Sequence, residues 1–454
     1  MNHRIFYHIY PLGFCGAPER NDFSCPAGGG LRSIAGHLPR LAELGVNALY
    51  LGPLFESTAH GYDTLDYFWV DRRLGTNADL TALVKASHQV GIAVILDGVL
   101  NHTGRHFFAF RDLSERGASS PYRDWYKGID FSRRSPWGDP FAYEGWHGCY
   151  DLVTLNGHNR EAREHLFKAA RFWIETFDID GLRLDAADLL LSDVMEELSA
   201  RCRAVKPDFW LLGEVIHGNY RQWAREGRLD SVTNYELYKS LWSSFNDHNF
   251  FELSWTLNRQ FGPDGLYRGL ALYNFLDNHD VNRVASTVKN RDHLVPLYGL
   301  LFSLPGFPSI YYGSEYGLRG ERTRESDRAL RPAWNDRPEA MGDEYRPPLN
   351  PSALYQAIAG FIRVRKEQAA LREGAFRELY RTHEQYAFLR EAVPGRGGPV
   401  LAAVNSASYP AEITIAPDVS GGKGWRDLMT GSEVSVGTLN LHLAPGEFRL
   451  LAGR

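Results

Sequence analysis

Short apolar runs alternate with segments of helical periodicity over most of the chain. Eight runs have the length and apolar character of buried strands, at residues 5–10, 46–51, 92–96, 180–185, 209–212, 231–235, 272–276 and 309–312. Apolar residues at helical spacing follow them and predict helices at residues 31–44, 77–91, 160–177, 190–205, 220–225, 237–259, 294–304 and 353–371. Units of this kind imply parallel strands with right-handed crossovers. Eight of them predict a closed (β/α)8 TIM barrel of the α/β class.

Two segments break this rhythm. Residues 105–157 separate the third strand from its helix and are rich in Trp, Tyr, Gly and Pro, which indicates a small inserted domain. Beyond residue 375 helical patterning stops, and short strands between Gly and Pro turns predict a C-terminal antiparallel β-sandwich at residues 375–454. The barrel then consists of residues 1–104 and 158–374.

Composition narrows the class of protein. The net charge is −5, so there is no electrostatic case for binding nucleic acid or an anionic membrane. No run approaches the roughly 18 apolar residues of a membrane helix. The first residues lack an apolar signal segment, so we expect a cytoplasmic protein. The four cysteines lack metal-ligand spacing and are interpreted as reduced thiols, with a Cys15–Cys25 bridge as the alternative.

Polar residues follow the strands at the end where a barrel places its active site. They are Asp97, Asn101 and His102 after the third strand, Arg183 and Asp185 on the fourth, Glu214 after the fifth, and Asn278, His279 and Asp280 after the seventh. Each alone has an ordinary interpretation as a strand-end residue facing water. Carboxylates that converge in one barrel mouth repel one another, so together these residues indicate chemistry.

Arg183 and Asp185 lie two apart in a strand and therefore face the same side. A cation beside a carboxylate favours the ionised form and lowers the pKa of Asp185. An isolated Arg-x-Asp is usually a structural ion pair. The neighbouring carboxylates change that interpretation, because glycoside hydrolysis needs one acid to protonate the leaving oxygen and another to attack.

Four separated motifs resemble the signatures of the α-amylase family of glycoside hydrolases. They are residues 97–102 (DGVLNH), 181–185 (GLRLD), 213–215 (GEV) and 275–280 (FLDNHD). Their order and spacing also fit that family, and the resemblance covers essentially the whole chain. Residues 152–156 (LVTLN) and 213–217 (GEVIH) are most similar to the neopullulanase and cyclomaltodextrinase group.

The resemblance implies a role for each matching residue. Asp185 is the expected nucleophile, Glu214 the general acid/base, and Asp280 the third carboxylate, which binds sugar hydroxyls. The substrate-binding residues it implies are Tyr62, Asp97, His102, Arg183, His217, His279, Asp327 and Arg331.

The chain also departs from the family pattern. That pattern places Lys-His soon after the nucleophile, where this chain has Asp188 and Leu189. The His would offer its carbonyl to calcium. Asn101 is retained, but no acidic calcium loop stands out, so no metal ligands are assigned and a structural calcium is an open alternative. No cofactor is required. Members of this group usually dimerise through an N-terminal domain that has no counterpart before the first strand, so we expect a monomer or a homodimer formed by another route.

The sequence therefore predicts a retaining hydrolase that cleaves α-1,4-glucosidic bonds of maltooligosaccharides or cyclodextrins through a covalent glycosyl-enzyme. One alternative is a transglycosidase, in which Trp137, Trp146 and Tyr150 shape a sugar acceptor site. A non-catalytic carbohydrate-binding relative and a barrel enzyme of unrelated chemistry are the others.

Overall fold

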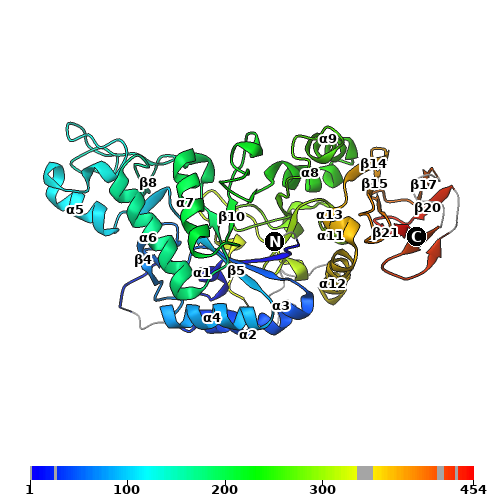
Figure 1. Cartoon of the computed structure of the whole chain (residues 1–454), viewed down its shortest axis with the longest axis horizontal. Coiled ribbons are helices and arrows are strands. Elements are labelled where there is room, and N and C mark those ends of the chain that lie inside the picture. The colour runs from blue at the N-terminus through cyan, green and yellow to red at the C-terminus, as the bar shows by residue number, and fades with distance from the viewer. Residues whose placement is uncertain (1–2, 25–27, 335–350, 417–423, 435–437, 454) are drawn as a thin grey trace.

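The computed structural model describes residues 3–24, 28–334, 351–416, 424–434 and 438–453. Figure 1 shows the parts arranged along the long axis of the molecule. The segment with α5 (Phe108–Arg116) lies at one end, the barrel is in the middle, and the C-terminal strands lie at the other end.

The predicted barrel is confirmed. Its eight parallel strands are β1 (Phe6–Ile9), β2 (Ala48–Leu51), β5 (Ala93–Gly98), β9 (Gly181–Leu184), β10 (Trp210–Gly213), β11 (Ser231–Val232), β12 (Tyr273–Phe275) and β13 (Phe307–Tyr311). They are hydrogen-bonded in the order β11-β10-β9-β5-β2-β1-β13-β12. A parallel bridge between Thr233 and Tyr273 joins the two ends of this order. Aromatic rings from different strands fill the interior: Phe6 lies 5.1 Å from Trp210 and 5.2 Å from Tyr273 between ring centroids.

Helices cover the outside of the barrel. They are α1 (Pro11–Phe14), α2 (Gly30–Gly36), α3 (Leu38–Leu44), α4 (Asn77–Gln89), α6 (Arg160–Phe177), α7 (Ser192–Val205), α8 (Tyr235–Asn246), α9 (Phe250–Phe261), α10 (Val284–Thr287), α11 (Leu294–Ser303), α12 (Pro351–Glu367) and α13 (Ala369–Glu373). Thr76 caps α4 in a capping box with Asp79.

Two predicted helices are each divided in the structure. The helix expected at residues 31–44 breaks at His37, because Pro39 cannot continue a helix but is tolerated in a first turn. The helix expected at residues 237–259 breaks after Asn246. There His248 has φ +48°, a left-handed value that a right-handed helix cannot contain.

The segment after β5 forms a sheet of its own. Strands β6 (His102–Gly104), β8 (Cys149–Thr154) and β7 (Gly145–Trp146) pair antiparallel in that order. An antiparallel pair that was not predicted, β3 (Phe55–Ser57) and β4 (Thr64–Val70), follows β2. Its short strands come from the stretch that carries Tyr62 to the barrel mouth.

The C-terminal strands form two antiparallel sheets. One is ordered β14 (Phe376–Arg381), β15 (Gln385–Arg390), β16 (Val400–Asn405), β21 (Phe448–Gly453), β18 (Trp425–Asp427) and β19 (Glu433–Val434), and the other pairs β17 (Ala411–Ile415) with β20 (Leu439–Leu443). Leu401 of the first sheet and Ile413 and Leu441 of the second belong to one buried apolar cluster. This shared core confirms the predicted sandwich.

No helix in the described ranges is long and apolar enough to cross a membrane. Cys15, Cys149 and Cys202 are free thiols, and Cys25 lies outside the described residues.

Candidate active site

One buried guanidinium connects three carboxylates at the C-terminal ends of β5, β9 and β10. Arg183 Nη1 contacts both Asp97 Oδ1 and Asp185 Oδ1 at 2.9 Å, and its Nη2 lies 2.8 Å from Glu214 Oε1. The Arg183 side chain is 3% exposed, so these charges interact in a region largely removed from water. The structure thus places three negative groups around a single positive one.

The backbone fixes the two carboxylates that flank Arg183. The Asp185 N–H donates to the Gly98 carbonyl (3.1 Å), and the Glu214 N–H donates to the Leu184 carbonyl (2.9 Å), which continues the parallel ladder past the strand ends. Ala186 then adopts φ +45°, a conformation that costs a residue with a side chain about 1–3 kcal/mol. In this conformation its N–H donates to Glu214 Oε2 at 3.1 Å, so the turn after Asp185 positions the Glu214 carboxyl.

The pKa of Asp185 depends on more than the charge of Arg183. Burial raises the pKa of Asp185 well above its ordinary value, and the nearby Glu214 and Asp97 charges raise it further, while Arg183 lowers it. The prediction of a lowered pKa was wrong because it counted the cation without the burial. Burial likewise raises the pKa of Asp97.

A second group of predicted residues lies beside this cluster. His279 Nε2 is 3.0 Å from Asp280 Oδ2, and Arg331 Nη2 contacts Asp280 Oδ1 (3.2 Å) and Asp327 Oδ2 (2.6 Å). The Tyr62 hydroxyl is hydrogen-bonded to His279 Nε2, and it donates to Asp97 Oδ2 at 3.2 Å. Through Tyr62 and His279 the two groups form one continuous polar site.

Both predicted site histidines are buried, and each has one ring nitrogen without a hydrogen-bond partner among the described residues. These atoms are His102 Nε2 and His279 Nδ1. His102 Nε2 lies 3.9 Å from Asp185 Oδ2. Burial lowers the pKa of His102 to about 3 and lowers the pKa of His279 well below its ordinary value, so both rings are neutral at pH 7. Neutral imidazoles with free nitrogens suit hydrogen bonds to sugar hydroxyls.

His217 is the predicted residue that the structure leaves outside the carboxylate cluster. Its side chain is exposed. Burial and the Glu214 charge raise the pKa of Asp188, which follows Ala187. The Ala187 N–H donates to the Glu214 carbonyl at 3.0 Å, so Asp188 and His217, three residues after Glu214, form a rim on the Glu214 side of the site.

The sequence did not single out two tyrosines of this site. Tyr50 donates to Asp97 Oδ2 at 2.9 Å, and the Tyr235 hydroxyl accepts a hydrogen bond from the Asn278 side chain at 3.1 Å. Tyr50 lies at the carboxyl end of the second predicted strand, which is a sufficient signal for an active-site position. Tyr235 is the last residue of the strand predicted at residues 231–235 and so carried the same signal, although in the structure it begins α8.

Comparison with known proteins places this geometry in a family. A sequence model described as the catalytic domain of alpha amylase matches residues 8–368. A cyclomaltodextrinase from Bacillus sp is 33% identical over 410 residues, which cover 85% of this chain and 70% of the relative. An intracellular maltogenic amylase of Bacillus subtilis (strain 168) is 33% identical over 337 residues, 70% of this chain and 56% of that protein.

Among solved structures, the cyclic α-maltosyl-(1→6)-maltose hydrolase from Arthrobacter globiformis superposes with a TM-score of 0.82 at 28% identity. The match covers 100% of this chain and 99% of that one.

Proposed function

Because the chain belongs to the α-amylase family of glycoside hydrolases, we propose that it hydrolyses α-1,4-glucosidic bonds of maltooligosaccharides or cyclodextrins with retention of configuration. The contact of one Arg183 guanidinium with both Asp185 and Glu214 carries this proposal. A shared guanidinium keeps two carboxyl groups close, and retaining enzymes need them only about 5–5.5 Å apart.

Glu214 is the proposed general acid/base and Asp185 the proposed nucleophile. Glu214 gives its proton to the glycosidic oxygen while the Asp185 carboxylate attacks the anomeric carbon, so the glycosidic bond breaks and a glycosyl ester forms. The ionised Glu214 then takes a proton from water, which attacks the same carbon and releases Asp185. Burial raises the pKa of Asp185 and Arg183 lowers it, so the proposed role of Arg183 is to keep the attacking carboxylate ionised.

The Asp280 side of the site is proposed to bind the sugar whose bond is cleaved. Asp280 accepts hydrogen bonds from the sugar hydroxyls. Tyr62 stacks on His279, with ring centroids 5.6 Å apart, and offers its ring to the sugar. Arg331 joins Asp280 to Asp327, which extends the polar surface away from Asp185. His102 supplies a further contact through its free Nε2.

The rim formed by Asp188 and His217 is proposed to meet the leaving sugar, because Asp188 follows Ala187, whose N–H donates to the Glu214 carbonyl, and His217 lies three residues after Glu214. If a sugar instead of water occupies this rim after the first step, the enzyme transfers the glycosyl group. Transglycosylation is therefore an outcome that the product analysis below distinguishes.

A second candidate substrate follows from one comparison. The Arthrobacter hydrolase acts on cyclic α-maltosyl-(1→6)-maltose, and it matches this chain over nearly the full length of both proteins. A cyclic maltosyl tetrasaccharide therefore belongs in the substrate panel. We also propose a cytoplasmic location, supported by the relative named as an intracellular amylase.

The test is product analysis of the purified enzyme on maltotriose, β-cyclodextrin, cyclic maltosyl-maltose, pullulan and soluble starch. Predominant cleavage of the small and cyclic substrates is expected. Rapid thinning of starch with poor use of small substrates would overturn the substrate assignment. Products longer than the starting oligosaccharide would favour the transglycosidase, and no turnover of any substrate would favour a binding protein.

A further inference from the structure

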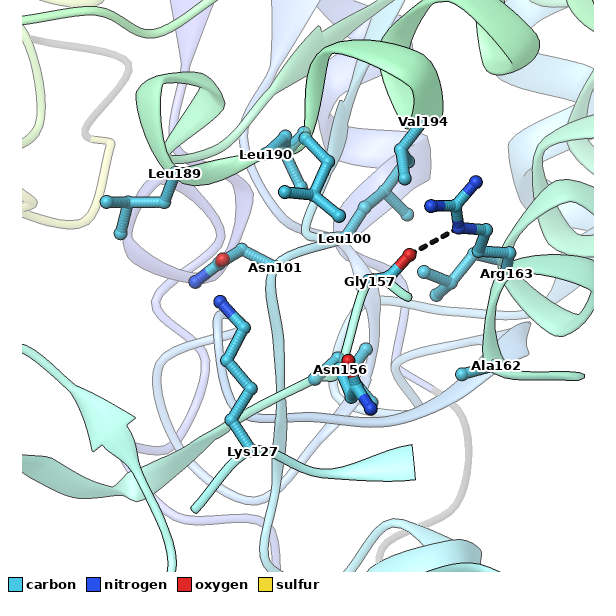
Figure 2. A pocket seen from close by; sticks show the side chains of 13 residues that line it. Leu100, Asn101, Lys127, Asn156, Gly157, Ala162, Arg163, Leu189, Leu190 and Val194 are labelled. Atoms are coloured by element: carbon cyan, nitrogen blue, oxygen red, sulfur yellow. Dashed lines mark hydrogen bonds between the residues drawn. The ribbon is translucent and has the colours of Figure 1, made fainter. Parts of the chain in front are cut away.

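A small cavity lies where several parts of the chain meet. It has a volume of about 20 Å³, enough for one water molecule. Its lining comes from the loop after β5, the inserted segment at Lys127, the stretch before α6, α6 itself, the loop that leads into α7 and the first turn of α7. These residues are Leu100, Asn101, Lys127, Leu155, Asn156, Gly157, Ala162, Arg163, Leu166, Leu189, Leu190, Leu191 and Val194 (Figure 2).

The resemblance to α-amylases implies a structural calcium here, next to Asn101 and the carbonyl of residue 189. Calcium takes six to eight oxygen ligands and favours carboxylates. No carboxylate is among the described residues that line the cavity. The Asn156 amide is already used, since its nitrogen donates to the Asp124 carbonyl (3.0 Å) and its oxygen accepts from the His158 N–H (3.1 Å). The described ranges also contain no cluster of three or more His, Cys, Asp or Glu that could hold a metal. This donor set does not fit calcium.

The charged side chains at the cavity are both cations. Arg163 is neutralised at its far end by Asp193, 2.8 Å away, and it also donates to the Gly157 carbonyl. Lys127 points the other way: in Figure 2 its side chain extends towards the Asn101 amide, with the ammonium at the tip. Because like charges repel, an ammonium at this place disfavours a divalent cation in the same cavity.

The backbone determines where the Lys127 ammonium lies. The Lys127 N–H donates to the Thr154 carbonyl and its carbonyl accepts from the Glu144 N–H, both at 3.0 Å. One residue further along, the Leu155 N–H donates to the Asn101 carbonyl at 2.9 Å. Lys127 is thus fixed on one side of the cavity and directed at the loop on the other side, and that loop continues into His102.

We propose that the Lys127 ammonium takes the place of a calcium ion between the inserted segment and the loop after β5. It brings a fixed positive charge to the polar groups around Asn101 and holds that loop in position. The junction, and with it the stability of the protein, then does not depend on calcium. This inference does not rest on the proposed substrate or mechanism.

The first experiment uses the wild-type full chain. Its Tm is measured by scanning calorimetry in EDTA and in excess calcium chloride. The same Tm in both is expected. A ligand that binds the native state raises the Tm, so an increase of several degrees in calcium would overturn the proposal.

The second experiment removes the charge. Lys127→Met keeps the apolar stem and is expected to lower the Tm, with no recovery in calcium, because no carboxylate is added. Lys168→Met is the matched control, since Lys168 lies on α6 with an exposed side chain; its Tm should equal that of the wild type. Lys127→Arg retains the charge and should retain most of the wild-type Tm, which also covers the case in which Lys127→Met does not fold.

Hydrogen exchange shows whether the effect is local. In Lys127→Met, faster exchange is expected in residues 100–104 and 152–157 and unchanged exchange in residues 385–405, which lie in the C-terminal sheet. Wild-type exchange and Tm in Lys127→Met, or a Lys127→Arg variant as unstable as Lys127→Met, would contradict the role of the ammonium.

Discussion

The mouth of the barrel and the C-terminal sandwich both bury strand residues, but the sandwich buries apolar side chains and the barrel mouth buries charged ones. In β16 every residue from Val400 to Val404 is fully buried and apolar, and its neighbours across the sandwich are Ile413 and Leu441. In β9 the equally buried strand contains Arg183 and leads into Asp185, which is 7% exposed. The sandwich gains stability from each residue it buries, whereas the barrel mouth loses stability by desolvating charges.

This contrast indicates what each region is for. Charged groups are almost never buried unless they are paired, and here three carboxylates share one cation. Such an arrangement persists only where the rest of the fold supports it, and groups with shifted pKa values concentrate at functional sites. Substitutions in the two regions should therefore have opposite signatures in activity and stability.

The largest effect is expected for Asp185→Asn. Loss of the proposed nucleophile should reduce kcat by on the order of 10⁴-fold or more. Burial raises the pKa of Asp185, so at a pH above the ordinary carboxyl pKa the ionised side chain lowers the free energy of unfolding. The neutral amide of Asn removes this cost and should leave the Tm unchanged or raise it. Steady-state kinetics and calorimetry check both expectations. Asp208→Asn, at an exposed position, is the control, and near-wild-type turnover by Asp185→Asn would show that the nucleophile is misassigned.

The second largest effect is expected for Arg183→Met, in the free energy of unfolding. Removal of the shared cation leaves the buried Asp97 and Asp185 and the half-buried Glu214 without their common cation, which should cost about 3–5 kcal/mol in the free energy of unfolding at pH 7. Part of that loss should return at acidic pH, where Asp97 and Asp185 become protonated. Urea denaturation at the two pH values measures it, and equal destabilisation at both would show that the loss is one of packing and not of charge.

In the sandwich, Leu401→Ala should have the reverse signature. The Leu401 side chain is fully buried, so its truncation should lower the free energy of unfolding by about 2–5 kcal/mol while kcat of the folded enzyme stays at the wild-type value. Denaturation and kinetics on the same preparation test this. A large fall in kcat at a temperature where the variant is fully folded would break the separation between the two regions.

The smallest effect concerns His102. Its pKa is about 3 in the folded protein and about 6.5 when unfolded, so between these values the unfolded state binds a proton that the folded state does not. His102 therefore reduces stability as the pH falls from 6.5 towards 3, by about 1.4 kcal/mol for each pH unit. In His102→Gln this contribution is absent, so the difference in unfolding free energy between pH 7 and pH 5 should be smaller than in the wild type. Identical differences would show that His102 is protonated in the folded protein.

The fold was predictable from the sequence to the extent that single strands and helices have local signals. All eight barrel strands and the sandwich were found in this way, because apolar runs and helical periodicity mark them directly. The break at His248 was missed because it lies inside continuous apolar periodicity and only the backbone conformation marks it, whereas Pro39 was a sequence signal for the break at His37 that the periodicity masked.

The site was predictable in its residue types but not in its electrostatics. The strand-end positions identified Asp97, Asp185 and Glu214, and the structure brings them to one guanidinium. The direction of the Asp185 pKa shift depends on the burial of that side chain, which adjacent residues do not reveal. The placement of Lys127 beside Asn101 was equally invisible, because a 26-residue separation in sequence gives no local signal.

The most direct test of the account is identification of the carboxylate that becomes glycosylated. The enzyme is treated with a fluorinated α-glucosyl fluoride, which slows hydrolysis of a glycosyl-enzyme, and its peptides are then examined by mass spectrometry. We expect one added sugar residue on the peptide that contains Asp185. A sugar on Glu214 or Asp280, or none on any peptide while the reagent is being turned over, would contradict the assignment of Asp185 as the nucleophile.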